Sequence, residues 1–412
     1  MALIQAMFSH SVIAEKSLLI CRCLAIIAAI TAPISTAVTS VACVAMLLMW
    51  LVSGQVWQGL KTSVQQPVGK MLLLFFAWLI ISSLYADTAW ADRVGTLSSW
   101  KKLLYTFVLL GLFYQARWKI RFIYGYLIAM SIAAVIAVPL WLLNVEVRPG
   151  REVAIFMTNH SSQSLAFVVA ALCCIFLFKE SPCPPKKALL IGLIILFTFN
   201  IFFVSASRSG YLALPVAAVF LVINLYGYKK LSHILVITLV ALMLVALTSS
   251  TLQQRIKLGL EENKNAQSSE NITSIGVRDI FRQNALELIK QKPLLGYGTS
   301  SFESVYSAYV ATKYQDWRGE SSSDPHNQYL FVWLENGLVG LLLFLVYIFT
   351  AIKQGAAQRS YGAIAASVFV VFAATSLFNS HFKTFSEGHL LAFFAGCLLG
   401  QQPTDRMEKD SA

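Results

Sequence analysis

The sequence predicts an all-α integral membrane protein with about twelve transmembrane helices and one large loop that contains short helices. Of its 412 residues, 57% are apolar and only 13% are charged, which is too few charges for the surface of a soluble protein of that length. Apolar runs of roughly 17–25 residues, the length that crosses about 30 Å of hydrocarbon, recur along the chain. Membrane orientation therefore explains the net charge of +12 better than nucleic-acid binding does.

The apolar runs divide the chain into two groups of spans separated by one polar stretch. Within residues 1–249 we expect nine spans, near 17–34, 37–54, 71–86, 102–116, 122–144, 163–178, 188–206, 210–227 and 232–249. Within residues 326–400 we expect three more, near 328–350, 362–379 and 388–400, followed by a tail at 401–412. The first run contains Arg22 and lacks a cleavage site of small residues, so we expect a retained helix and not a signal peptide.

The basic residues between the spans follow the positive-inside pattern. If the N-terminus is cytoplasmic, every connection on that side carries Lys or Arg, namely Lys61, Lys70, Arg117, Lys119, Arg121, Lys179, Lys186, Lys187, Lys229, Lys230, Lys353, Arg359, Arg406 and Lys409. Arg93, Lys101 and Lys102 fall on the outer side and are exceptions to the pattern. An even number of spans then places both termini in the cytoplasm and the loop at 250–325 outside it.

The outer loop is expected to contain an amphipathic helix near 276–292. Its apolar positions lie on one helical face and are Ile280, Phe281, Ala285, Leu288 and Ile289. Pro293 ends the helix, and two glycines, Gly296 and Gly298, form the turn beyond it.

Arginines near the outer ends of the spans are candidates for binding phosphate. Arg208 lies between two spans with almost no connection, where an arginine either faces a cavity or extends to the lipid headgroups. Arg278 and Arg282 lie four residues apart on the loop helix, so both can project from the same side. The guanidinium fork matches phosphate oxygens in pairs, and converging arginines would form a diphosphate clamp. A solvated helix face is the alternative for Arg282.

His326 is the candidate general base. It follows Asp324-Pro325, which favours a turn, and we expect it in the first turn of the tenth span, at the outer membrane surface, beside Asn327. An imidazole with a pKa near ~6.5 can take a proton from a hydroxyl at neutral pH. A structural, hydrogen-bonded histidine is the alternative.

Two further polar groups are candidates for binding sugar hydroxyls or lipid phosphate, or for anchoring span ends at the membrane interface. They are Arg148, Arg151, Asn159 and His160 before the sixth span, and Asn379 and His381 between the last two. The sequence lacks an Asp-x-Asp pair, a His-Glu-x-x-His helix, a Gly-x-Ser-x-Gly elbow and a phosphate-binding P-loop, so we expect no metal, no other cofactor and no ATP-driven transport.

Four of these segments together resemble the O-antigen ligase family, which includes O-antigen polymerases and protein-glycosylating oligosaccharyltransferases. They are Ser207-Arg208-Ser-Gly210, Gly276-Val-Arg278, Pro293-Leu-Leu-Gly296-Tyr-Gly298, and His326-Asn-Gln-Tyr-Leu330 followed by Glu335-Asn-Gly337-Leu-Val-Gly340. Their order and spacing carry the resemblance, which covers roughly residues 150–400. The earlier residues match only in being apolar spans.

The resemblance implies a function and a location. The implied donor is a glycan on undecaprenyl diphosphate, and the ligase branch transfers it to lipid A-core oligosaccharide on the periplasmic face of the bacterial inner membrane, in lipopolysaccharide biosynthesis. The family's two functional arginines correspond to Arg208 and Arg278, and its histidine to His326. A polymerase, with a second lipid-linked glycan as acceptor, and a protein O-oligosaccharyltransferase are alternatives. A polysaccharide transporter or flippase is a more distant one, because the halves of the chain look unlike and the ionisable groups gather at span ends.

Overall fold

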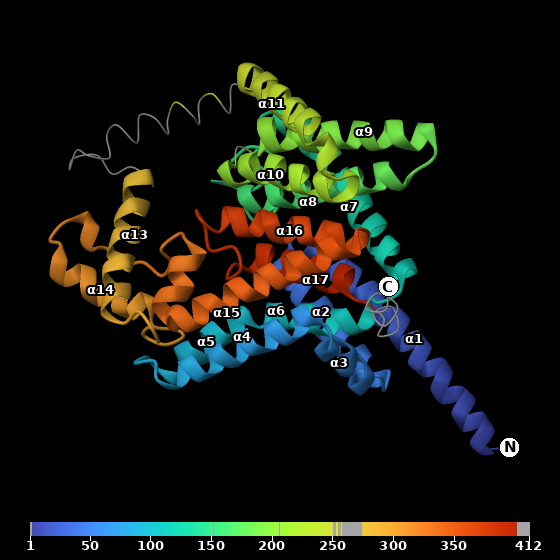
Figure 1. Ribbon diagram of the computed structural model, residues 1–412, viewed down its shortest axis with the longest axis horizontal. Coiled ribbons are helices and arrows are strands. Elements are labelled where there is room, and N and C mark those ends of the chain that lie inside the picture. The colour runs from blue at the N-terminus through green and yellow to red at the C-terminus, as the bar shows by residue number, and fades with distance from the viewer. Residues whose placement is uncertain are drawn as a thin grey trace.

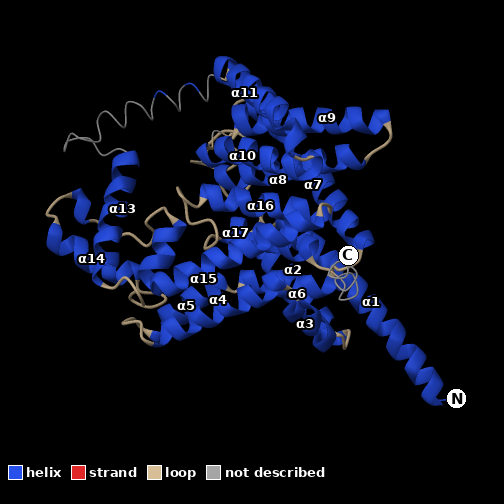
Figure 2. Cartoon of the chain, in the orientation of Figure 1, coloured by secondary structure: helices blue, strands red, loops and turns tan. Residues whose placement is uncertain are grey.

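The computed structural model describes residues 2–150, 152–205, 207–249, 253, 257 and 274–401. Within this part of the chain every regular element is a helix (Figure 2). Twelve of the helices coincide with the twelve expected spans: α1 (Ala2–Thr31), α2 (Thr36–Val52), α4 (Pro67–Leu84), α6 (Lys102–Leu112), α7 (Ala116–Leu142), α8 (His160–Glu180), α9 (Pro184–Phe199, continued by η1, Asn200–Val204), α10 (Arg208–Tyr226), α11 (Leu231–Thr248), α15 (Gln328–Gln358), α16 (Tyr361–Thr375) and α17 (Phe385–Leu399).

The large loop was expected to contain short helices, and its described part holds α13 (Ser274–Gln291), α14 (Phe302–Lys313) and the 3-10 turn η3 (Trp317–Gly319). Three elements outside this loop were not expected, namely α3 (Val56–Gln65), α5 (Trp90–Trp100) and the 3-10 turn η2 (Tyr228–Lys230). Among the described residues, six helices are long and apolar enough to cross a membrane, or seven if α2 and α3, which are bent by 107°, count as one span. The crossing of a membrane by all twelve therefore stays a prediction.

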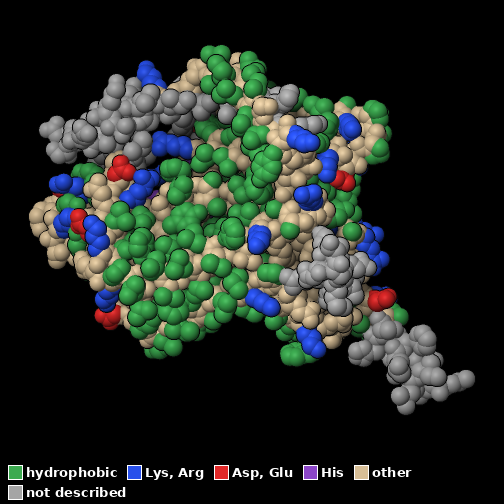
Figure 3. All heavy atoms as spheres, viewed as in Figure 1, with side chains coloured by type: hydrophobic (Ala, Val, Ile, Leu, Met, Phe, Trp, Pro, Cys, Tyr) green, Lys and Arg blue, Asp and Glu red, His purple; other side chains and the backbone are tan. Residues whose placement is uncertain are grey.

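The helices form a bundle with two distinct ends (Figure 1). One end carries α13 and α14, together with the segments 157–162, 207–209, 324–327 and 376–387, which hydrogen bonds join to one another, and is called the loop end below. At the opposite end, the tail end, α1 begins and α17 finishes. Figure 3 shows hydrophobic side chains over the middle of one face, with Lys and Arg side chains toward both ends. Such a distribution fits an apolar belt between two polar surfaces.

The centre of the bundle is formed by helices that are buried on nearly every side. In the most apolar stretch of 18 residues of α8, 83% of the residues are buried. The helix α17 is buried from Ser386 to its last residue. A helix that is apolar all round belongs in such a position. By contrast, α11 exposes a series of large side chains, including Leu239 and Leu247. The buried central helices therefore determine where the segments that connect them lie at the loop end.

A break in α15 anchors the loop that follows α13. Gly337 has φ +65° and ψ −173°, and the chain of residues 293–298 packs against it. Leu338 N donates to Pro293 O over 2.9 Å, and Gly298 N donates to Glu335 O over 2.7 Å. Gly296 takes φ +72°, as expected of a glycine turn after the helix.

The position of His326 corrects the sequence-based expectation. We expected it in the first turn of the tenth span, but α15 begins at Gln328 with Asn327 as its N-cap, so His326 lies before the helix. Its φ is +52°, a left-handed conformation that few residues other than glycine adopt. The reason is the Asx-type turn formed by Asp324, whose carboxylate accepts from His326 N over 2.7 Å.

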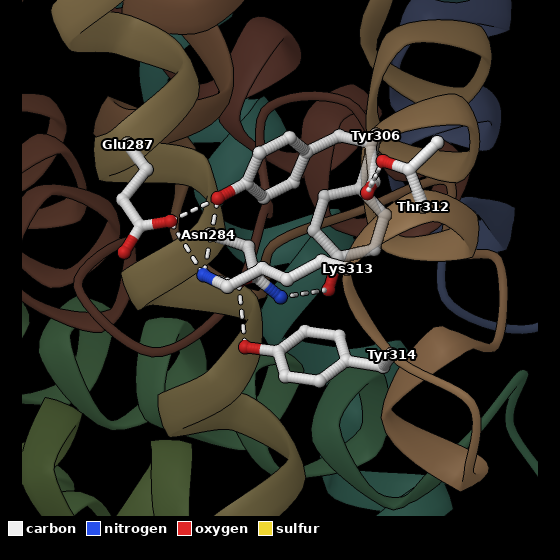
Figure 4. Close-up of polar contacts among 7 residues, drawn as sticks. Asn284, Glu287, Tyr306, Thr312, Lys313 and Tyr314 are labelled. Carbon is white, nitrogen blue, oxygen red and sulfur yellow. Dashed lines mark hydrogen bonds and ion pairs between the residues drawn. The ribbon is translucent and has the colours of Figure 1, made fainter.

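A polar cluster fastens α13 to α14 (Figure 4). Asn284 donates to the Tyr306 hydroxyl and accepts from Lys313 Nζ and the Tyr314 hydroxyl, each over 3.2 Å. Lys313 also forms an ion pair with Glu287. Along the adjoining face of α13, Ala285, Leu288 and Ile289 are buried, as the amphipathic pattern predicted. The helix that carries Arg278 is therefore held by both polar and apolar contacts.

Candidate active site

His326 is held at the loop end by its backbone and by its ring. Its backbone N–H donates to Asp324 Oδ1, which also accepts from Ser380 Oγ over 2.6 Å. The ring lies beside the Asn379 side chain and stacks on Phe281 of α13, with centroids 6.1 Å apart and planes inclined by 15°. A backbone in a sparsely populated conformation is costly, and it persists only where its surroundings determine it.

The environment of His326 favours the neutral imidazole. Burial lowers its pKa from the usual value and is the largest cause. The charge of Asp324 and the Asn379 side chain raise this pKa and the charge of Arg278 lowers it, with a lowered pKa as the net result. A neutral ring is the form that can accept a proton.

Two residues, Ser209 and Asn379, lie between Arg208 and His326. It is the first residue of α10, and its side chain is exposed. The next residue, Ser209, accepts a hydrogen bond from Asn379 Nδ2 over 3.2 Å. Asn379 thus contacts the start of α10 and lies beside the ring of His326, which in turn stacks on Phe281 of α13.

Arg282 lies on the same helix as Arg278 but has partners of its own. Its guanidinium forms an ion pair with Asp279 Oδ1 at 3.2 Å and lies over the Phe378 ring, 6.0 Å from the centroid. The side chain is 32% exposed. Part of its charge is therefore neutralised, which makes it a weaker phosphate ligand than its spacing alone suggested.

Asn327 caps α15 with its side chain. Its Oδ1 accepts from Tyr329 N over 3.0 Å and from Leu330 N over 3.1 Å, and its Nδ2 donates to Leu377 O over 3.1 Å. An N-cap of this kind satisfies backbone donors that have no partner within the helix. The side chain thus holds the start of α15 against the segment that carries Asn379.

The candidates before the sixth span lie at the loop end too. Asn159 is the N-cap of α8 and accepts from Ser162 N over 2.7 Å. His160 Nδ1 lies 3.6 Å from Glu152 Oε2, with both side chains nearly half exposed. Arg148 is half-buried, and Arg151 lies outside the described residues.

His381 is buried near Asp324, the acidic group that also acts on the candidate base. Its side chain is 2% exposed, and its Nε2 has no hydrogen-bond partner among the described residues. Burial lowers its pKa, while Glu387 and Asp324 act in the opposite direction. It contacts the Phe372 ring edge-on, as a packed core residue does.

Several residues of the site were not predicted from the sequence. Asp324 was identified only as a turn former, and Phe281 only as part of an apolar face. The Asp-Pro-His spacing is the signal for an Asx turn that would have assigned Asp324. Ser209 and Ser380 gave no local signal. Among the described residues, no group of three or more His, Cys, Asp or Glu side chains is placed to hold a metal ion.

Comparison with known proteins identifies the domain that contains these residues. Residues 193–345 match the family model described as O-antigen ligase. An O-antigen ligase of Salmonella typhimurium is 26% identical over 208 residues, which is 49% of this chain and 48% of that protein. An uncharacterised protein of Haemophilus influenzae is 32% identical over 158 residues, or 36% of this chain and 38% of that protein.

A putative polysaccharide ligase of Rickettsia conorii is 34% identical over 88 residues, covering 20% of this chain and 21% of that protein. In none of these three relatives does the match extend beyond about half of the relative's length. Arg208, Arg278 and His326 all fall inside the matched domain.

Proposed function

Because the chain belongs to the O-antigen ligase family, we propose that it transfers a glycan from undecaprenyl diphosphate to lipid A-core oligosaccharide. In this proposal it is an inner-membrane glycosyltransferase of lipopolysaccharide biosynthesis, with both termini in the cytoplasm and the loop end in the periplasm. The observation that supports it best is the convergence of His326, Arg278 and the start of α10 within the matched domain. A base and two phosphate-binding groups are what such a transfer needs.

The arginines would act on the leaving group. In the transfer, the bond between the anomeric carbon and the phosphate oxygen breaks, and undecaprenyl diphosphate leaves with the bonding electrons. Arg208 and Arg278 would neutralise the negative charge that develops on that oxygen. Since a lipid diphosphate is already an activated leaving group, the proposed step uses neither ATP nor a metal ion.

His326 would act on the acceptor. Its neutral imidazole would take the proton of an acceptor sugar hydroxyl while the hydroxyl oxygen forms the new bond to the anomeric carbon. A single displacement of this kind inverts the configuration at that carbon. Asn379, which lies beside the ring and donates to Ser209, would keep the base in line with the diphosphate end of the donor.

Exchange of arginine for lysine tests the diphosphate clamp. Lysine keeps the charge but cannot present paired donors, so Arg208→Lys and Arg278→Lys should each lower the transfer rate by about 10-fold or more. Lys290→Arg is the matched control, because Lys290 lies exposed at the other end of the same helix α13 and should be replaceable without effect. Wild-type rates in either Arg→Lys variant would remove the support for the clamp.

Deletion of the gene, followed by gel analysis of lipopolysaccharide and of lipid-linked glycan, tests the ligase against its alternatives. Loss of a ligase should leave full-length polymer on the lipid carrier and the core uncapped. Loss of a polymerase should instead leave the core capped with a single repeat, and loss of a protein glycosyltransferase should leave lipopolysaccharide unchanged. Either of these two results would contradict the proposal.

A further inference from the structure

A cavity of about 260 Å³ lies at the tail end, far from the candidate active site. It is enclosed by α1, the end of α2, α3 and the end of α6, and polar side chains at its wall include Arg22, Gln58, Thr62 and Tyr114. Ligand pockets for drug-sized molecules commonly measure about 300–1,000 Å³, so this cavity has room for a small polar group and not for a glycan.

The cavity presents hydrogen-bond donors and a positive charge. Arg22 is only 8% exposed; its Nε donates to Leu112 O over 3.0 Å, and its guanidinium lies 5.2 Å from the centre of the Trp118 ring. The Nε1–H of Trp50 has no hydrogen-bond partner among the described residues. None of the described residues that line the cavity is acidic. An arginine buried in an apolar helix without an acid beside it is expected to serve a ligand or a cavity.

The helix α3, which forms one wall of the cavity, indicates the depth in the membrane at which the cavity opens. This helix turns away from α2 by 107°, so it cannot continue the direction of that span. Gln58 and Thr62 line the cavity, whereas Trp57 has 73% of its surface exposed on another side of the helix. A short amphipathic helix with an exposed tryptophan is typical of the headgroup layer of a membrane.

The surroundings of the cavity are basic. Lys61 of α3 is exposed near it, and Arg117 and Arg121 begin α7 shortly after Tyr114, which lines the cavity. Basic pockets between transmembrane helices at the membrane surface commonly hold anionic lipid headgroups. From the cavity, the buried arginine and the interfacial helix, we propose that this site binds the phosphate of an anionic phospholipid headgroup.

The site would be a lipid-binding site distinct from the donor and acceptor sites at the loop end. The phosphate would accept from the Arg22 guanidinium and from the donors around it, while the acyl chains remain in the bilayer beside α2 and α3. Such a lipid would connect α3 to α1, whereas α3 already contacts α6 directly through the hydrogen bond from Ser63 Oγ to Phe107 O over 2.6 Å. A zwitterionic phospholipid carries a compensating cation, so it should bind more weakly.

Native mass spectrometry of the full chain in detergent tests this proposal, with short-chain phosphatidylglycerol, phosphatidylcholine and inorganic phosphate as separate probes. The wild-type protein should retain one phosphatidylglycerol with at least tenfold preference over phosphatidylcholine. Arg22→Gln should abolish the preference. Thr62→Phe should abolish it too, because it fills the cavity while leaving Arg22 and its contacts in place.

Lys353→Gln is the matched control, because it removes a positive charge from an exposed position of α15 that does not line the cavity. It should keep the tenfold preference. Equal retention of the two lipids by the wild type, or an unchanged preference in folded Thr62→Phe, would overturn the proposal. Displacement of bound phosphatidylglycerol by millimolar inorganic phosphate would also count against it, because the site would then accept a free anion.

Discussion

Replacing Gly337 by alanine should weaken the contact between α15 and the loop that follows α13. Gly337 has φ +65° and ψ −173°, a region essentially restricted to glycine, and an alanine there would cost on the order of 1–3 kcal/mol. An added Cβ would also lie 2.1 Å from Leu294 O, so the loop must move and its hydrogen bond from Leu338 N to Pro293 O would be lost. That bond adds about 1 kcal/mol, for a total near 3 kcal/mol.

Substitutions at two other glycines separate the backbone strain from the steric overlap that together destabilise Gly337→Ala. At Gly150, φ is +75° but nothing lies within 4 Å of an added Cβ, so Gly150→Ala should cost about 1–2 kcal/mol from backbone strain alone. At Gly192, inside α9, an added Cβ also meets nothing within 4 Å and φ is not positive, so Gly192→Ala should be neutral or stabilise by up to about 1 kcal/mol.

Thermal unfolding of the purified proteins in detergent, followed by intrinsic fluorescence, should give midpoint temperatures that increase from Gly337→Ala through Gly150→Ala to Gly192→Ala. Gly337→Ala should have the lowest midpoint. It should also transfer glycan more slowly at a temperature where it remains folded, because the displaced loop carries α13 and hence Arg278 away from His326. A Gly337→Ala protein with the midpoint and transfer rate of the wild type would refute this reasoning.

Two further predictions concern the base and the topology. Because burial lowers the pKa of His326, the transfer rate should fall as pH falls through a midpoint below about 6.5. Asp324→Asn should move this midpoint to lower pH, since Asp324 raises the pKa of His326. Arg278→Gln should move it to higher pH, since Arg278 lowers that pKa. A midpoint common to all three proteins would contradict the assignment. In intact spheroplasts, an impermeant thiol reagent should label Ser321→Cys but not the exposed Cys183, and the reverse pattern would overturn the topology.

The positions of the long helices could be predicted from the sequence because each depends on a local run of apolar residues. The helix at 276–292 was predictable for a similar reason, since its apolar face repeats with the helical period. The short helices α3 and α5 were missed, because their 10 and 11 residues of mixed polarity give no comparable signal. How many helices cross a membrane depends on tilt and depth, which the apolar runs do not specify.

The chemical types at the candidate site could be predicted, but their connections could not. The hydrogen bond from Asn379 to Ser209 joins residues 170 positions apart, and no local pattern indicates such a pair. The ion pair between Arg282 and Asp279 is different, because an (i, i+3) pair on a predicted helix can be recognised in the sequence. The left-handed backbone of His326 depends on the Asp324 carboxylate, so it follows from a tertiary arrangement that also includes Ser380.

The most direct test of the proposed function is transfer by the purified protein in detergent, with undecaprenyl-diphosphate-linked glycan and lipid A-core oligosaccharide as the only substrates. Transfer, unlike transport, needs no second compartment, so the wild-type protein should form glycan-capped core under these conditions. His326→Gln keeps hydrogen-bonding capacity but cannot accept the proton at neutral pH, and its rate should be about 10²–10⁴-fold lower. Absence of product with the wild type, or a near-normal rate with His326→Gln, would contradict a glycosyl transfer in which His326 is the base.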